Sequence, residues 1–564
     1  MKSFAQVITV GTTMLLFAGI TYSQTIPPAD VMITGEGPDD DFGWQVAPAG
    51  DVNGDGIPDL IVGAPSNDAV AQFAGRAYLF YGPLQGKINA ANADATISAE
   101  AFGDNLGISV ASAGDVNGDG FDDLLIGARS NDDNGIQAGR VYLLYGPVSG
   151  SLAATSADAI ITGAAFDELG RAVSPAGDLN GDGFDDIILG TDIAGPGFAG
   201  QVFVFNGPLS GLRAAASADA IITGSFANES FGASVASGDL DGDGISDLIV
   251  GAPRFPLNGA DTGRAYVFYG PVAGSIIASD ADAIVFGENI NDSFGTSVAS
   301  AGDIDGDGQA DLIVGANQIF NQGPGKAYLF KGPIAGEIQA SAATAIFTGE
   351  AAQDLFGNSV ASAGDFNGDG FADVIVGAPD NGAAASRAGR AYLFFGPVSG
   401  MIAATDADFI ATGEPGDELG MSVASGDLKG DGGSDIMIGA PGFTDGLPGY
   451  AATFFGRQAK LRLTITPRDG SIVIPPEGGT FRYDLEVIND TGNSRTLDVW
   501  VVLSGQDMTR TLVRFRQSFP AGEFHRTLRQ KIPGSLEPGS YVIIGNLGKF
   551  PTARGTDNFG LTKE

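Results

Sequence analysis

Short apolar segments alternate with turns of glycine, proline and aspartate along most of the chain. In the first unit these segments are Gln45 to Ala47, Leu60 to Val62, Arg76 to Tyr81 and Ala95 to Ser98. The same order returns seven times, at intervals of 61 to 64 residues. Four short strands in a long, fixed period are typical of a β-propeller blade. The sequence therefore predicts seven blades; a β-helix is the alternative, but its rungs are shorter.

The two ends of the repeat region predict how the ring closes. A fourth-strand motif reads ADAIITG from Ala157 and from Ala218, and ADFIATG from Ala407. No copy follows the seventh unit, which ends at Gly456, whereas the motif appears near the N-terminus as ADVMITG, residues 29–35. We expect this N-terminal strand to complete the last blade, which removes an open sheet edge.

Each unit also carries a loop rich in carboxylates. The copies begin with GDVNGDG or a close variant at Gly50, Gly114, Gly177, Gly238, Gly302, Gly364 and Gly426. Counted from the first aspartate, oxygen side chains stand at positions 1, 3, 5 and 9. In the first copy these are Asp51, Asn53, Asp55 and Asp59, and at position 7 Ile57 offers only its backbone carbonyl.

This spacing follows the first part of an EF-hand calcium loop, including the glycine at position 6. No bidentate glutamate follows at position 12, and the run Leu60-Ile61-Val62 indicates that the loop joins strands rather than helices. Asp, Asn and Gly also favour simple turns. However, clustered carboxylates repel one another unless a cation lies between them, and hard oxygen donors without His or Cys favour calcium.

We therefore expect up to seven calcium ions. The predicted ligands are Asp51, Asn53, Asp55, Ile57, Asp59, Asp115, Asn117, Asp119, Phe121, Asp123, Asp178, Asn180, Asp182, Phe184, Asp186, Asp239, Asp241, Asp243, Ile245, Asp247, Asp303, Asp305, Asp307, Gln309, Asp311, Asp365, Asn367, Asp369, Phe371, Asp373, Asp427, Asp431, Gly433 and Asp435. In the seventh copy Lys429 replaces the ligand at position 3, so occupancy of that loop stays open.

The composition supports the same interpretation. The formal net charge is -39 although only 17% of the residues are charged, and the loop ligands supply 23 of the carboxylates. A surplus of acid on this scale argues against nucleic acid or an anionic membrane as the partner, because both require a basic surface.

Residues 1–23 resemble a secretory signal peptide. Lys2 is followed by an apolar stretch from Val7 to Ile20, with small residues Thr21 and Ser23 before a cut ahead of Gln24. A membrane anchor is the alternative, but the stretch is short for a span. The chain has no cysteine and no later long apolar run. We expect a protein without a membrane span, secreted to the extracellular space or the cell surface.

Two short motifs flank the carboxylate loop. Phe-Gly precedes it at Phe42, Phe231, Phe294 and Phe356, and Gly-Ala-Pro follows it at Gly63, Gly251 and Gly377. In these motifs the region 29–457 resembles the FG-GAP repeats of integrin α chains and their bacterial relatives. Departures are Leu106, Leu169 and Leu419 in the first motif and Arg129, Asp192 and Asn317 in the second. The resemblance implies a seven-bladed propeller with calcium in loops of the lower face and ligand binding by loops of the upper face.

The period ends after the propeller, which we assign to residues 24–457. Residues 458–564 alternate apolar and polar positions between turns, which predicts an immunoglobulin-like β-sandwich and an all-β chain. Basic residues concentrate there: Arg510, Arg514, Arg516, Arg526 and Arg529. They form either a solvated strand face or a surface that docks on the acidic propeller or an acidic polymer.

Catalysis finds little support in the sequence. His525 is the only histidine and there is no cysteine, which leaves few ways to build a nucleophilic triad. Acidic residues cluster at 39–41, 167–168 and 417–418, so a polysaccharide-active hydrolase is kept as an alternative. A structural component of a cell surface or matrix is a second alternative.

The leading hypothesis is a monomeric, secreted adhesion or ligand-binding module for an extracellular protein or glycan. Alternation of strands puts the carboxylate loops at one end of the blades and the connections between second and third strands at the other. In those connections Phe255, Ile319 and Phe320 are apolar where a turn alone would not require it. We expect these residues to contribute to the binding face, or else to tuck back against the blade.

Overall fold

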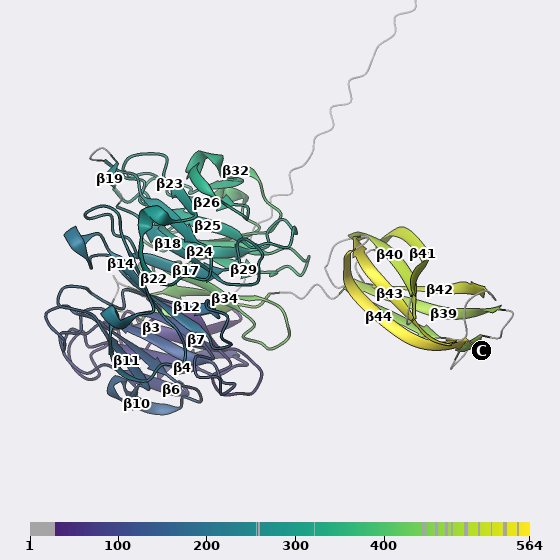
Figure 1. Cartoon of the computed structure of the whole chain (residues 1–564), viewed down its shortest axis with the longest axis horizontal. Helices are drawn as coiled ribbons and strands as arrows, with labels where there is room; N and C mark the ends of the chain where they lie inside the picture. Colours follow the sequence, from purple (N-terminus) through teal and green to yellow (C-terminus); the bar gives the residue numbers. More distant parts are fainter. Residues whose placement is uncertain are drawn as a thin grey trace, which may run out of the picture.

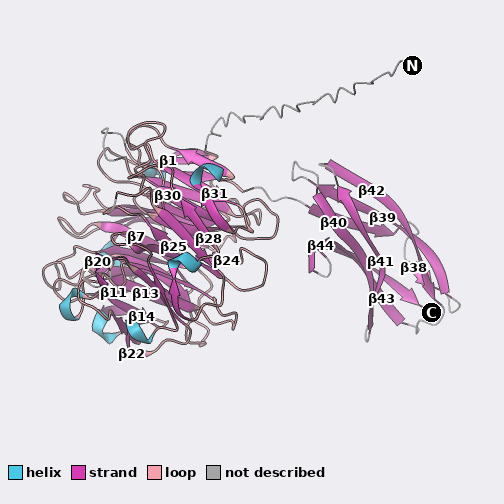
Figure 2. Cartoon of the chain, turned by 90° about the horizontal axis from the view of Figure 1, so that it is seen from above, coloured by secondary structure: helices cyan, strands magenta, loops and turns pink. Residues whose placement is uncertain are grey.

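The computed structural model describes residues 29–254, 256–257, 260–320, 322–442, 446 and 448–456, together with the backbone of eight strands between Leu461 and Lys563 (Figure 1). The predicted signal peptide and Phe255 lie outside the described residues. In the described part, nearly all of the regular secondary structure is β-strand, and the only helices are single 3-10 turns (Figure 2).

Seven four-stranded antiparallel sheets form the propeller, and we number them as blades 1 to 7. Blade 1 contains β2 (Val46–Gly50), β3 (Asp59–Ala64), β4 (Arg76–Phe80) and β6 (Ala95–Ser98). Blade 2 contains β7 (Leu106–Gly114), β8 (Asp123–Ala128), β9 (Arg140–Leu144) and β11 (Ala159–Thr162). Blade 3 contains β12 (Ala172–Gly177), β13 (Asp186–Thr191), β14 (Gln201–Phe205) and β16 (Ala220–Thr223).

The next blades repeat this order. Blade 4 contains β17 (Ser234–Gly238), β18 (Asp247–Ala252), β21 (Arg264–Phe268) and β23 (Ala283–Phe286), with a small hairpin of β19 (Pro256–Leu257) and β20 (Ala260–Asp261). Blade 5 contains β24 (Phe294–Gly302), β25 (Asp311–Ala316), β26 (Lys326–Phe330) and β28 (Ala345–Thr348). Blade 6 contains β29 (Ser359–Gly364), β30 (Asp373–Ala378), β31 (Arg390–Phe394) and β33 (Phe409–Thr412).

Blade 7 joins the two ends of the repeat region. It contains β34 (Ser422–Gly426), β35 (Asp435–Ala440), β36 (Tyr450–Phe454) and, as its fourth strand, β1 (Val31–Thr34). The antiparallel register pairs Val31 with Thr453 and Thr34 with Tyr450. The predicted closure by the N-terminal strand is confirmed.

A fifth strand, which the sequence analysis did not predict, extends six of the sheets. The strands concerned are β5 (Gly86–Asn89), β10 (Gly150–Ala153), β15 (Gly211–Ala214), β22 (Gly274–Ile277), β27 (Gly336–Gln339) and β32 (Gly400–Ala403). Each pairs in parallel with the fourth strand of the preceding blade, as β10 does with β6. Blade 6 ends on β33 in the described structure, since the chain leaves the repeat pattern after Gly456.

A short 3-10 turn follows each of these fifth strands, and another lies in the connection between β13 and β14. They are η1 (Ala90–Asn92), η2 (Ala154–Ser156), η3 (Pro196–Phe198), η4 (Ala215–Ser217), η5 (Ala278–Asp280), η6 (Ala340–Ala342) and η7 (Ala404–Asp406). Six of them begin with a buried alanine, which anchors the crossover between neighbouring blades.

The core lies between blades rather than inside one sheet. Every residue of β3 is buried, because one face packs on the preceding blade and the other on the next. Ile61 of blade 1, for example, belongs to the same apolar cluster as Leu124 and Ile126 of blade 2. The ring of Phe42 packs edge-on against Tyr78, with centroids 5.3 Å apart.

The glycines of the two flanking motifs meet across each blade boundary. A Cβ on Gly63 would lie 2.0 Å from the carbonyl oxygen of Gly107, which itself has a φ of +85°. The same contact joins Gly439 of blade 7 to Gly43 of blade 1. Glycine is required there because two backbones approach too closely for any side chain.

The last strands form two sheets. They are β37 (Leu461–Pro467), β38 (Ile472–Ile474), β39 (Gly478–Asn489), β40 (Arg495–Gly505), β41 (Met508–Phe519), β42 (Gly522–Pro533), β43 (Gly539–Lys549) and β44 (Thr552–Lys563). One sheet has the order β37-β39-β42 and the other β38-β44-β43-β40-β41. All-β structure is as predicted, whereas the immunoglobulin-like topology and the domain boundaries stay predictions. The side chains of the predicted basic residues and of His525 lie outside the described structure.

Candidate divalent-cation sites

Each carboxylate loop connects the first and second strands of its blade, at the end that we call the lower face. In blade 1 the Asp51 carboxylate accepts hydrogen bonds from the N–H groups of Gly54 (2.8 Å), Asp55 (2.9 Å) and Gly56 (2.8 Å). The loop thus wraps around its first aspartate. Asp55 in turn accepts a bond from the N–H of Ile57 at 2.9 Å. In the loops of blades 2 to 7 the first aspartate likewise accepts backbone N–H groups, among them those of Gly120, Gly183, Gly244, Gly308, Gly370 and Gly432.

The aspartate at position 9 is the most buried acidic group of the loop. Asp59 accepts bonds from Val52 N–H (3.0 Å) and Gly82 N–H (2.9 Å), which tie the loop to the end of β4. Its counterparts are Asp123, Asp186, Asp247, Asp311, Asp373 and Asp435, all of them buried. Burial is the main cause that raises the pKa of Asp59 to about 7, and the nearby carboxylates of Asp55 and Asp51 add to it.

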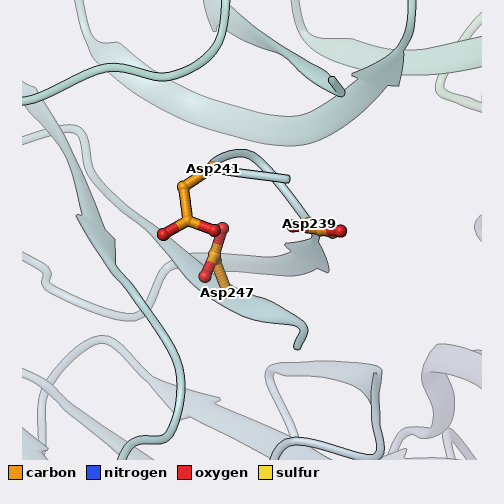
Figure 3. Close-up of side chains that lie close together, drawn as sticks. All are labelled: Asp239, Asp241 and Asp247. Atoms are coloured by element: carbon orange, nitrogen blue, oxygen red, sulfur yellow. The ribbon is translucent and has the colours of Figure 1, made fainter. Parts of the chain in front are cut away.

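Two loops bring three carboxylates within 4.8 Å of one another. They are Asp239, Asp241 and Asp247 in blade 4, and Asp303, Asp305 and Asp307 in blade 5. Figure 3 shows the carboxylates of Asp241 and Asp247 pointing toward each other in the blade 4 loop. These groups could hold a divalent cation.

The donor set fits a hard cation. All side-chain donors in the loops are carboxylate or amide oxygens, and oxygen ligands are those that calcium and magnesium prefer. In blade 6 the amide oxygen of Asn367, at position 3, is buried without a hydrogen-bond partner. A buried acceptor without a donor is costly, and a cation at this position would satisfy it.

The side chain at position 7 has a packing role that the sequence analysis missed. A Cβ built on Gly54 would lie 2.4 Å from the ring of Phe121, which comes from the loop of the next blade. Phe184 covers Gly118 in the same way, and Ile57 covers Gly430 across the closure. In these blades one loop therefore supports its neighbour. The apolar residue at position 7 was the signal that could have predicted this packing.

Two lysines change the charge of their loops. The Lys429 ammonium, in blade 7, lies 2.9 Å from Asp431 Oδ2. Lys331, at the end of β26, forms an ion pair with Asp305 in blade 5. Lys429 occupies a ligand position, whereas Lys331 lies outside the loop and leaves all four of its acidic side chains in place.

At the opposite end, the upper face, the acidic pairs considered for hydrolysis organise the loops. Asp40 accepts bonds from Gly37 N–H (3.1 Å) and from the side-chain amide of Asn67 (2.9 Å). Asp417 accepts one from the hydroxyl of Tyr450 at 2.8 Å. Glu418 is buried and paired with Arg387. These carboxylates bind groups of their own loop and of neighbouring loops and strands, so they hold the upper face together.

The loops of the upper face are joined in pairs and expose large apolar side chains. The connection after the second strand of one blade meets the connection into the next blade: Phe166 N–H donates to Ile136 O at 2.8 Å, and Asn105 N–H to Phe73 O at 3.1 Å. The exposed apolar residues on these loops are Val70, Phe73, Phe102, Ile136, Phe166, Phe198, Phe226, Ile290, Ile319 and Phe320.

Of the residues predicted for this face, Ile319 and Phe320 are exposed, the latter at 55%. Arg254 lies over the Phe320 ring, 6.0 Å from its centroid, yet the ring does not tuck back into the blade. The sequence analysis missed Phe102, which is 68% exposed, and the other residues of the loops that enter each blade. A phenylalanine or isoleucine shortly before the Phe-Gly or Leu-Gly motif was the signal that could have found them.

Comparison with known proteins decides the family. Residues 42–80, 106–144, 169–205, 231–268, 294–330 and 356–394 match the FG-GAP repeat. The chain belongs to the FG-GAP repeat proteins. Each match begins at the Phe-Gly or Leu-Gly motif and ends with the third strand of a blade. The matches cover blades 1 to 6, and the loop of blade 7 has Lys429 at position 3.

Relatives of this FG-GAP protein include integrin α chains. It is 34% identical to integrin alpha-5 of Xenopus laevis over 222 residues, which is 37% of this chain and 20% of that protein. It is 33% identical to integrin alpha-V of Gallus gallus over 225 residues (38% and 20%). For integrin alpha-IIb of Homo sapiens the identity is 38% over 162 residues (27% and 15%). The chain thus spans a fifth or less of these relatives.

Among solved structures, a β-glucosidase from Listeria innocua in complex with glucose aligns over 18% of this chain and 16% of its own. The TM-score is 0.15 and the identity 12%, so this likeness carries no argument. In the described part of the FG-GAP chain, no helix has the length and apolar character needed to cross a membrane.

Proposed function

We propose that this FG-GAP protein is a secreted, calcium-binding propeller that acts as an adhesion or ligand-binding module. Its lower face carries the calcium loops and its upper face contacts an extracellular protein or glycan. The integrin α relatives support a binding role for the propeller in general. In this proposal the lower face stabilises the fold and the upper face recognises the ligand.

Calcium is the cation that the loops favour. Six loops offer an oxygen side chain at positions 1, 3, 5 and 9 and carry three or four carboxylates. Their first aspartates already accept several backbone N–H groups, which orders the loop around a centre of negative charge. A flexible loop of hard oxygen ligands suits calcium better than magnesium, which requires stricter octahedral geometry. When bound, the cation would neutralise these carboxylates.

The observation that carries the binding assignment is the set of exposed apolar side chains on the upper loops of blades 1 to 5. A soluble surface rarely groups such side chains unless they meet a partner, and aromatic residues often dominate interface energy. Phe102, Phe166 and Phe226 all stand in the loops that enter successive blades. In the loops that enter blades 6 and 7, Ala352 and Pro415 stand where the loop into blade 2 has Phe102.

Binding is favoured over catalysis because the upper-face carboxylates are engaged in loop structure. Asp40, Asp167 and Asp417 each accept the N–H of a residue three positions earlier in the same loop. An acid–base pair needs two carboxyl groups that face a shared substrate, and these groups are held within separate loops.

An array of matrix proteins and glycans, probed with the full chain in calcium, tests the proposal. We expect a ligand whose binding falls at least roughly tenfold when Phe102 and Phe166 are both replaced by serine, since each is an exposed anchor. The matched control is Met401→Ser, because Met401 is 90% exposed but lies on a fifth strand away from the upper loops. Equal loss in the control, or undiminished binding in the double variant, would reject the upper face; no ligand on any array would favour a structural role.

A further inference from the structure

The seventh loop has a positively charged side chain at one of its ligand positions. Lys429 stands at position 3, where the other six loops have Asn or Asp, and its ammonium lies 2.9 Å from Asp431 Oδ2. Asp431 is the position-5 residue of the same loop. A lysine has no lone pair to offer a metal at neutral pH, so one ligand is lost and one positive charge is gained.

Lys429 also lies beside the joint that closes the ring. Its ammonium is 5.6 Å from the centroid of the Phe455 ring. The backbone N–H of Phe455 donates to the carboxylate of Asp30 at 2.9 Å, and Asp30 N–H donates to Thr453 O at 3.0 Å. Asp30 immediately precedes β1. The lysine, the end of β36 and the start of the N-terminal strand therefore form one contact group.

We propose that the seventh loop is closed by the Lys429 ammonium in place of a divalent cation, and that this tethered charge keeps the closing blade formed when calcium is absent. The acidic surroundings of the ammonium are Asp431, Asp435 and Asp30. A calcium ion entering this loop would meet a fixed positive charge in place of an oxygen ligand. The inference rests on the proposed calcium binding of the other loops.

The other lysine near a loop serves as a comparison. Lys331 pairs with Asp305, but it comes from the end of β26 and leaves the position-3 carboxylate in the blade 5 loop. That loop has four acidic side chains, so one pairing still leaves three carboxylates for a cation. Blade 5 is therefore expected to keep its site, whereas blade 7 is not.

The position of the lysine-closed loop in blade 7 affects how the ring responds to loss of calcium. Blades 1 to 6 are each made of one continuous stretch of chain, but blade 7 depends on non-covalent pairing of β1 with β36. Loss of calcium would loosen loops in the other blades without opening the ring. The propeller would then recover its full structure when calcium returns.

Two measurements on the full chain test this inference, with calcium as the probe. The first is the number of calcium ions bound, counted by native mass spectrometry: we expect six for the wild type, seven for Lys429→Asn and five for Asn53→Lys, which copies the lysine into blade 1. The second is hydrogen exchange of the β1 and β36 amides in chelator, expected to be roughly tenfold faster or more in Lys429→Met than in the wild type.

Lys331→Met is the matched control, since it removes a lysine that pairs with a position-3 carboxylate but lies far from the closure in sequence. It should leave six ions and unchanged exchange of β1. Seven ions in the wild type would overturn the lysine-closed loop, and unchanged β1 exchange in Lys429→Met would overturn its role in closure. If no loop binds calcium, the proposed calcium function fails, while the exchange measurement still decides the role of Lys429.

Discussion

Asp30 and Phe455, 425 positions apart, are joined by a 2.9 Å hydrogen bond from the Phe455 N–H to the Asp30 carboxylate. The same bond occurs inside continuous blades, from Tyr81 N–H to Asp94 and from Tyr145 N–H to Asp158. The N-terminal segment thus takes the place that a seventh copy of the fourth strand, following β36, would have occupied. The ring is therefore closed by the same hydrogen bonds that join the third and fourth strands within the other blades.

The first prediction concerns the closing strand. Ile33 is fully buried in β1, whereas Met32 beside it is only partly buried. We expect Ile33→Ala to lower the free energy of unfolding by about 2–5 kcal/mol, as for other buried aliphatic side chains, although the residue lies near the N-terminus. Met32→Ala should lower it by less, because Met32 is only partly buried. Deletion of residues 29–35 should cause aggregation through the exposed edge of β36. Chemical denaturation and light scattering measure both effects; a deletion variant as stable as the parent would contradict the closure.

The second prediction separates one calcium loop from the lysine loop. Asp55→Ala should remove one bound calcium, because Asp55 is the position-5 carboxylate of blade 1. The equivalent change in blade 7, Asp431→Ala, should remove none. At a hundredfold excess of calcium over Kd, a lost site lowers the calcium-dependent part of the stability by about 2.7 kcal/mol. Isothermal titration of each variant gives the count, and equal losses in the two variants would argue against the distinction.

The third prediction is a pH dependence on the upper face. Glu229 is completely buried, and this burial raises its pKa from 4.5 to about 7, against the opposing effect of hydrogen bonds from Phe226 and Ser225 N–H. Because the folded state binds the proton more tightly than the unfolded state does, ionisation destabilises the fold above pH 7. This cost fades as the pH falls from 7 toward 4.5.

Glu229→Gln should therefore be more stable than the wild type at pH 8 by up to about 3 kcal/mol, given 1.36 kcal/mol for each pKa unit. The advantage should shrink steadily on acidification to pH 5. Glu414→Gln, at an exposed glutamate of an equivalent loop, is the control and should show no such trend. Urea unfolding at several pH values measures the difference; a constant gap between variant and wild type would contradict the assignment.

The blades, their closure and the carboxylate loops could be predicted because each has a local, periodic signal. Seven copies of the loop fix the period, and the displaced motif at Ala29 fixes the closure. The fifth strands could not be predicted in the same way. A stretch such as Gly86–Asn89 is mostly exposed, so it has no alternation of apolar and polar positions, and its partner belongs to another blade.

Contacts between blades could not be predicted either, because they join residues of neighbouring repeats. The packing of Phe121 on Gly54 and the contact of Gly63 with Gly107 depend on how neighbouring blades are rotated, which the sequence of one repeat does not encode. The flanking motifs were recognisable as a pattern before their reason was visible. The structure supplies that reason: two glycines that touch across each boundary.

The most direct test of the account is the melting temperature of the full chain in excess calcium and again in chelator. Binding to the folded state alone contributes about 2.7 kcal/mol per site at a hundredfold excess over Kd, and several sites add up. We predict a large fall in Tm on chelation, restored by calcium and reproduced only weakly by magnesium. An identical Tm in calcium and in chelator would contradict the central claim that the carboxylate loops are calcium sites that stabilise the propeller.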